Sequence, residues 1–177
     1  MEITTKTNLI ASLRDSQQRA GAWFAEIPAD QFFARAGEVW SASDNLDHLI
    51  RSHKPLVKAL KLPKITLRAM FGSPDQPSRR YEAMCDVYRA KLAQGGVAGG
   101  SYLPDQQSPA NVEDAKSDLL NRFSKAAAEL ASIVETWNDD ELDGYLLPHP
   151  LLGKLTIREM LFFTIYHNLR HASREGD

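Results

Sequence analysis

His167 and His171 lie four residues apart in a strongly helical, mostly apolar segment near the end of the chain. That spacing places both imidazoles on one face of an α-helix, one turn apart. Two neutral imidazole nitrogens that point the same way can supply two ligands to a divalent metal ion. The pair therefore raises the hypothesis of a metal site, which requires a third ligand from elsewhere in the chain.

The overall composition narrows the classes of protein to be considered. The chain has 177 residues, and we expect them to form a single domain over 1–177 with a substantial core. A net charge of −2 gives no electrostatic case for nucleic acid or an anionic membrane surface as a partner. The longest apolar run, 160–165, is too short to span a bilayer, and the first residues lack the pattern of a signal peptide. Cys85 is the only cysteine, which excludes an internal disulfide and favours a cytoplasmic location.

The hydrophobic periodicity predicts an all-α protein. We expect four main helices, at about 5–26, 41–60, 109–137 and 156–172, and an extra helix at 78–94. Pro55 lies inside the second of these and is expected to kink or shorten it. No strand alternation longer than a few residues is present.

Two capping boxes mark where the second and the last main helix begin. Ser41 is followed three residues later by Asp44, and Thr156 is followed by Glu159. In each pair the hydroxyl accepts one unpaired backbone N–H, and the carboxylate accepts the backbone N–H of the capping residue.

The long connection between the second and third main helices suggests how the helices run. It is about fifty residues long, against two to eight between antiparallel neighbours of a bundle. We therefore expect a four-helix bundle with a crossover, in which these two helices are parallel and the extra helix lies across the outside. The second and fourth main helices are then antiparallel.

His48 is the candidate for the third ligand. It lies about 10 Å from the start of its helix, so it falls at the height of His167 and His171 if the two helices are antiparallel. The helical wheel gives His48 only partial support, because it lies about 100° from the centre of the apolar stripe. His53 lies closer to that centre and is a rival, either as a ligand or as a core histidine.

Two segments resemble the DinB-like superfamily. Residues 40–49, WSASDNLDHL, are similar to its W-S-x-x-E-x-L-x-H-L segment, with Asp44 where glutamate is more usual. Residues 149–159, HPLLGKLTIRE, followed by His167 and His171, resemble its H-P-x-x-G-x-L-T-x-x-E…H-x-x-x-H ending. The resemblance implies an up-down-down-up four-helix bundle and a divalent metal, often nickel or zinc, held at the positions of His48, His167 and His171.

The superfamily includes bacillithiol and mycothiol-dependent S-transferases, and the resemblance also makes a homodimer plausible. It implies a metal-dependent enzyme that uses a low-molecular-weight thiol or acts as a hydrolase on a small-molecule substrate. The alternative is a non-catalytic metal-binding or structural bundle that works through an interface. Region 61–109 carries no motif of the superfamily and is where substrate specificity could be encoded.

Other side chains near these motifs could also take part in chemistry or in packing. Arg170 is a candidate for holding an anionic substrate and Tyr166 for a hydrogen-bond donor beside the site, although both are equally well explained as surface or rim residues. His149 precedes a proline and is expected to stabilise a turn. Trp23 and Trp40 are expected in the core.

Several metal and phosphate chemistries are excluded. The last histidine pair has the spacing of H-E-x-x-H, but Asn168 replaces the glutamate that serves as general base in zinc metalloproteases. The paired E-x-x-H motifs of di-iron bundles and a glycine-rich phosphate loop after a strand are also lacking.

Overall fold

Helices make up nearly all the regular structure of this computed structural model, which describes residues 3–173. The outermost residues of the domain predicted over 1–177 lie outside this range. The described elements are α1 (Lys6–Glu26), α2 (Ala29–Phe32), α3 (Ala42–Leu60), α4 (Lys64–Phe71), α5 (Tyr81–Ala93), the 3-10 helix η1 (Gly100–Tyr102), α6 (Val112–Glu135), α7 (Asp139–Gly144), β1 (Leu146–His149), β2 (Gly153–Thr156) and α8 (Ile157–His171). The predicted all-α class is confirmed, with one small hairpin added.

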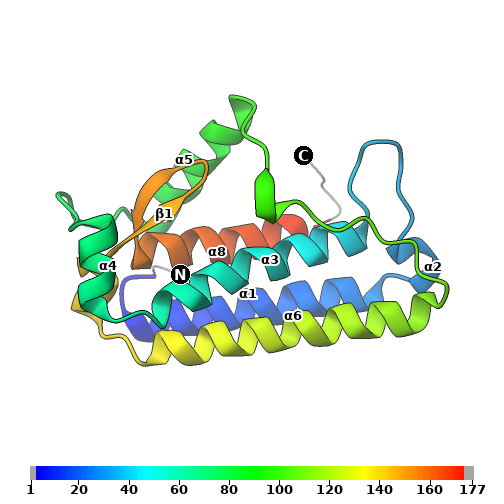
Figure 1. Ribbon diagram of the computed structural model, residues 1–177, viewed down its shortest axis with the longest axis horizontal. Coiled ribbons are helices and arrows are strands. Elements are labelled where there is room, and N and C mark those ends of the chain that lie inside the picture. The colour runs from blue at the N-terminus through cyan, green and yellow to red at the C-terminus, as the bar shows by residue number, and fades with distance from the viewer. Residues whose placement is uncertain (1–2, 174–177) are drawn as a thin grey trace.

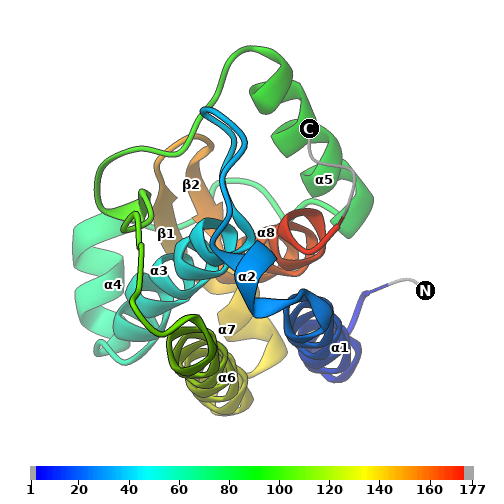
Figure 2. The ribbon, with the colours of Figure 1, turned by 90° about the vertical axis from the view of Figure 1, so that its right-hand side faces the viewer.

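The four longest helices lie side by side, as the two views of Figures 1 and 2 show. Contacts join α3 to α6, α6 to α1, α1 to α8 and α8 to α3. The colours of Figure 1 show that α1 and α8 run in one direction and α3 and α6 in the other. The start of α3 therefore lies at the same end of the structure as the end of α8.

Both predicted capping boxes are present. The Ser41 side chain accepts the Asp44 backbone N–H while the Asp44 carboxylate accepts the Ser41 N–H, and Thr156 and Glu159 are paired in the same way. These bonds satisfy N–H groups that the first turn of a helix leaves unpaired. They fix the first residues of α3 and α8, and with them the height of every side chain further along each helix.

Apolar side chains fill the space between the four long helices. One cluster includes Leu13, Leu130 and Phe162, and a second, toward the start of α3, includes Phe24 and Leu49. None of the described helices combines the length and the apolar character needed to cross a membrane.

The structure differs from the prediction mainly in region 61–109 and in the short elements. Region 61–109 forms α4 as well as the expected α5. Helix α3 continues past Pro55 to Leu60. The hairpin pairs Leu146 with Thr156 and His149 with Gly153. Strands of four residues are too short to show the alternation on which a sequence-based prediction of strands depends.

Buried polar contacts tie the start of α5 to the start of α8. Arg79 donates from its backbone N and from Nε to Oε1 of Glu159, at 2.9 and 2.7 Å. Nearby, the Ser78 hydroxyl donates to Asp143 and lies 2.7 Å from the Thr156 hydroxyl. These contacts hold α5 against the outer side of α8, where it forms one wall of the cavity described below.

Candidate metal centre

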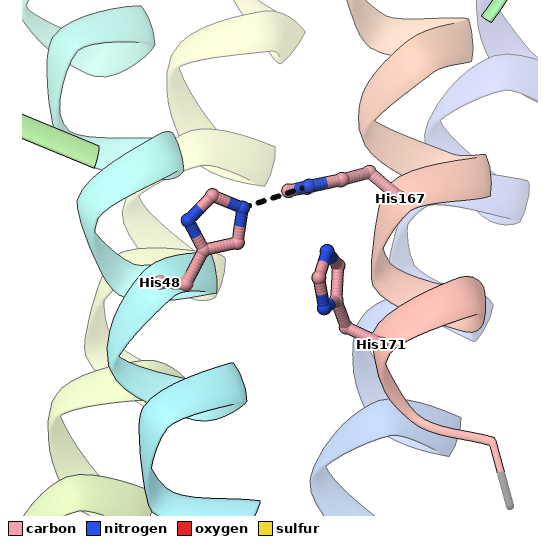
Figure 3. A group of neighbouring side chains, drawn as sticks. All are labelled: His48, His167 and His171. Carbon is pink, nitrogen blue, oxygen red and sulfur yellow. Dashed lines mark hydrogen bonds between the residues drawn. The ribbon is translucent and has the colours of Figure 1, made fainter. Parts of the chain in front are cut away.

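Three histidine side chains converge between α3 and α8 (Figure 3). Each of His48, His167 and His171 offers one ring nitrogen, and these nitrogens all lie within 4.8 Å of one another. Nε2 of His48 is 3.0 Å from Nε2 of His167. His48 and His167 are buried and His171 is partly buried. The structure thus brings together the three histidines proposed from the sequence, at the height expected from antiparallel α3 and α8.

The outer nitrogens of two of the rings have fixed hydrogen-bond partners. Nδ1 of His48 lies 2.7 Å from the backbone carbonyl oxygen of Tyr102, and Nδ1 of His171 lies 2.6 Å from Oδ1 of Asn45. Both partners are acceptors, so each Nδ1 carries the proton and donates it. Each Nε2 therefore carries a lone pair: that of His48 lies 3.0 Å from Nε2 of His167, and that of His171 lies 3.3 Å from Nη1 of Arg170. This is the tautomer that binds a metal through Nε2.

The two acceptors are themselves held in place. Nδ2 of Asn45 donates to the Ser41 carbonyl at 2.9 Å, which turns Oδ1 of the amide toward His171. Tyr102 belongs to η1, and the next residues are secured because the Asp105 backbone N donates to Oδ2 of buried Asp47 at 3.0 Å. The sequence carried no signal for Asn45 or Tyr102, because a single asparagine on a helix or a backbone carbonyl in a loop matches no motif.

Replacing Asn45 tests this support. We expect Asn45→Ala to weaken the affinity for a divalent metal about 10- to 100-fold, because His171 loses the acceptor that fixes its tautomer. Asn45→Asp keeps an acceptor and should restore most of the affinity. The dissociation constant can be measured by competition with a chromogenic chelator, with the exposed Asn121→Ala as a control on α6. An unchanged constant in Asn45→Ala would show that the contact does not orient the ring.

Burial keeps the three imidazoles neutral. It lowers the pKa of His48, an effect that Arg170 reinforces and the hydrogen bond to Tyr102 opposes. Burial also lowers the pKa of His167 and of His171 well below the usual value, and the neighbouring histidines lower both further. Neutral imidazoles at pH 7 are the form that binds a metal.

His53 does not join the cluster. It is fully buried, its Nε2 lies 3.1 Å from Oδ1 of Asn168, and its ring stacks on Phe123 of α6 at 5.7 Å between centroids. Burial lowers the pKa of His53 to about 4, so its ring is neutral. In the structure His53 is a core histidine that packs between α6 and α8, outside the cluster.

His149 stabilises a turn, as predicted. Its Nδ1 accepts the backbone N–H groups of Leu151 and Leu152, both at 3.2 Å, and burial lowers its pKa to about 4. Its ring packs edge-on against Phe163 with the centroids 4.3 Å apart, and Phe163 stacks on His167 at 4.8 Å. The hairpin turn is thus linked through two aromatic contacts to the histidine cluster.

The remaining candidates are distributed around the cluster. Arg170 borders the cavity, and its Nη1 lies 3.3 Å from Nε2 of His171. Tyr166 packs edge-on against Tyr88 and is not among the described residues that line the cavity. Trp40, expected in the core, instead stacks beside His171 at 6.2 Å and forms a wall of the site.

Trp23 is partly buried and packs against the second apolar cluster, as expected of a core residue, and it also borders the same cavity. The prediction of a core position is therefore wrong for Trp40 alone of the two. Cys85 is buried in α5, and burial raises the pKa of its thiol. This environment disfavours a reactive thiolate.

The histidine cluster opens into a large cavity of about 1480 Å³. Its floor is formed by α3 and α8, and its walls by α5, the hairpin and the loop from Gly96 to Leu103. Region 61–109, which offered no motif, thus supplies the wall that contains Tyr88 and Leu92.

The fold and the cluster together define a mainly helical protein with a candidate three-histidine metal centre that borders a large cavity. A family model described as the DinB superfamily matches residues 12–173, and the chain belongs to this superfamily. The search of curated proteins and the search of solved structures gave no match.

Proposed function

We propose that the protein binds one divalent transition metal through His48, His167 and His171 and uses it to act on a small molecule. The convergence of the three ring nitrogens carries this proposal. Ligands about 2.1 Å from one tetrahedral ion lie only a few ångströms apart, so small side-chain rotations bring all three into range. The two Nδ1–H donors satisfied outside the cluster support the fit.

We assign the four long helices to the up-down-down-up bundle of the superfamily, formed by a single domain. In this assignment α5 lies outside the bundle, in the long connection between α3 and α6. The contacts among α1, α3, α6 and α8 and their directions in Figure 1 support it.

Neutral nitrogen ligands favour zinc or nickel in such a site, with cellular availability deciding between them. Bound there, the ion would be a Lewis acid that lowers the pKa of a water molecule or a thiol. The chain itself contributes a largely apolar cavity and, beside the histidines, the positive charge of Arg170. These features support a thiol-dependent transferase or a hydrolase more than a module that works only through an interface.

Turnover by metal-loaded protein tests this proposal. Protein stripped with a chelator and reloaded with one equivalent of zinc or nickel is assayed for transfer of a low-molecular-weight thiol to an electrophilic aryl halide and for hydrolysis of activated esters. We expect rates at least about tenfold above those of stripped protein and of loaded His48→Ala. Stoichiometric metal without turnover of either substrate class would refute the enzyme and leave a metal-binding module.

A further inference from the structure

The cavity floor is an elongated strip that leads away from the histidine cluster. On α3, the residues that line the cavity recur at three- and four-residue spacing from the cluster to the far end of the helix: His48, Ser52, Pro55, Leu56 and Ala59. On α8 the matching residues run in the opposite direction: His171, His167, Thr164, Phe163 and Met160. One face of each helix therefore borders the cavity along its length. On α3 the lining also continues past His48 to Asn45 and Ala42, so the histidines lie near one end of the strip and its longer arm runs from His48 to Ala59.

The strip has a definite length. His48 and Ala59 are eleven residues apart on one continuous helix, which corresponds to about 16 Å at 1.5 Å per residue. Phe71 of α4 borders the cavity at the end away from the histidines. A fully extended alkyl chain advances about 1.25 Å per carbon, so about twelve carbons would fill this length.

The strip is apolar even where its residues carry hydroxyl groups. The Ser52 hydroxyl donates to the His48 carbonyl at 2.9 Å, and the Thr164 hydroxyl donates to the Met160 carbonyl at 2.8 Å. Their protons are thus used within their own helices. Pro148, in the hairpin wall, has no backbone N–H to offer a ligand. Between the ends, the floor presents mainly carbon atoms.

Apolar side chains also remain uncovered around the cavity. Val39, Val97 and Leu103 come from two separate loops and are 68%, 74% and 47% exposed, and all three border the cavity. Large apolar side chains gathered at the rim of a cavity gain free energy when a ligand covers them.

The histidine end has the opposite character. Three neutral imidazoles would leave the charge of a divalent ion uncompensated, and Arg170 adds a further positive charge beside His171. Among the described lining residues Glu38 is the one carboxylate, so a divalent ion and Arg170 together would leave a net positive charge. Since opposite charges attract strongly in a partly buried site, this charge favours an anionic group that can also bind a metal.

We propose that the cavity binds an elongated alkyl anion, with its head group at the histidine end and a tail of about twelve carbons along α3 and α8. The position of the head group rests on the proposed metal site, whereas the tail contacts do not. The substrate class that follows is a medium-chain amphipathic molecule, as opposed to a compact polar one.

A series of n-alkyl carboxylates from hexanoate to hexadecanoate, each below its micelle concentration, tests the tail. Binding is measured by calorimetry on metal-free and on zinc-loaded protein. We expect the affinity to rise about two- to fourfold per added methylene and to level off near twelve carbons. An affinity independent of chain length would overturn the proposal, as would a continued rise through sixteen carbons.

Ala59→Trp tests the position of the tail, because the indole would occupy the far end of the strip. We expect it to weaken dodecanoate binding by tenfold or more and to leave hexanoate binding within about twofold. Lys58→Trp, on the exposed side of the same helix, should change neither. An equal loss for both ligands in Ala59→Trp would place the tail elsewhere. Ala59→Leu, a smaller change, should weaken dodecanoate binding less.

Two further measurements separate this proposal from the metal site. Zinc should strengthen dodecanoate binding and not dodecylammonium binding, while the metal content of each sample is determined by elemental analysis. Bound zinc with no dependence on chain length refutes the alkyl ligand alone. Chain-length dependence in a protein that binds no zinc refutes the metal site and the head-group position, and retains the tail site.

Discussion

His171→Ala should lose at least about 100-fold in affinity for zinc or nickel relative to the wild type, because two imidazoles remain where three converged. His167→Ala and His48→Ala are expected to behave in the same way, since each removes one nitrogen of the same cluster. Elemental analysis after dialysis, followed by titration against a chelator of known affinity, measures the effect.

The matched control is His53→Gln. Its side-chain amide can still donate to Asn168, and His53 lies outside the cluster, so we expect wild-type metal content. Thermal denaturation gives an independent readout. Metal at about 100 times its dissociation constant should stabilise the wild type by about 2.7 kcal/mol and leave His171→Ala nearly unchanged. Equal metal content in the wild type and all three cluster variants would reject the site.

Glu159→Ala should lower the free energy of unfolding by about 1–3 kcal/mol, because it removes a buried carboxylate that accepts hydrogen bonds from the half-exposed Arg79 and from the first turn of α8. The carboxylate is buried and accepts bonds from Arg79 and from the Thr156 backbone N, so the substitution also removes one of the two hydrogen bonds of the α8 capping box. Urea denaturation at pH 7.5 measures the loss.

Two further variants serve as comparisons for the loss of stability in Glu159→Ala. Glu159→Gln keeps an acceptor for the cap and should fall between the wild type and Glu159→Ala. Glu113→Ala changes an exposed glutamate in the first turn of α6 and should stay within about 0.5 kcal/mol of the wild type. If Glu159→Ala unfolded at the same urea concentration as Glu113→Ala, the pair would contribute nothing to stability.

The pH dependence of this contribution has a definite sign. Burial raises the pKa of Glu159, but the hydrogen bonds and charge of Arg79 and the bond from Thr156 outweigh burial, so the pKa is lowered below 4.5. A carboxyl group with a lowered pKa in the folded state stabilises the protein above its unfolded pKa and loses that contribution as the pH falls through the folded pKa. The difference between the wild type and Glu159→Ala should therefore shrink below pH 4.5.

Local patterns predicted the start of the two helices that carry the site. Ser41 with Asp44 and Thr156 with Glu159 form their capping boxes within a single turn, so neighbouring residues alone determine them. The spacing of His167 and His171 likewise fixes their shared face, because helix geometry does not depend on what packs around it.

Tertiary packing decided between His48 and His53. His53, near the centre of the apolar stripe of α3, points into the core between α6 and α8, where it stacks on Phe123 and lies 3.1 Å from Asn168. His48 lies off the stripe and faces α8, where His167 and His171 approach it. A helical wheel measures only the distance from the centre of a stripe and cannot tell which neighbouring helix covers each side of it.

The sequence by itself determined the five longest helices, the capping boxes of α3 and α8, and three histidines able to meet if those two helices run in opposite directions. Only the tertiary structure supplied Asn45 and the Tyr102 carbonyl as hydrogen-bond acceptors, moved Trp40 from the expected core to the wall of the site, and shaped the cavity. The physical reason is the separation in sequence between the residues that interact. Helix formation depends on residues within one or two turns, whereas ring tautomers and cavity walls depend on segments more than fifty residues apart that only folding brings into contact.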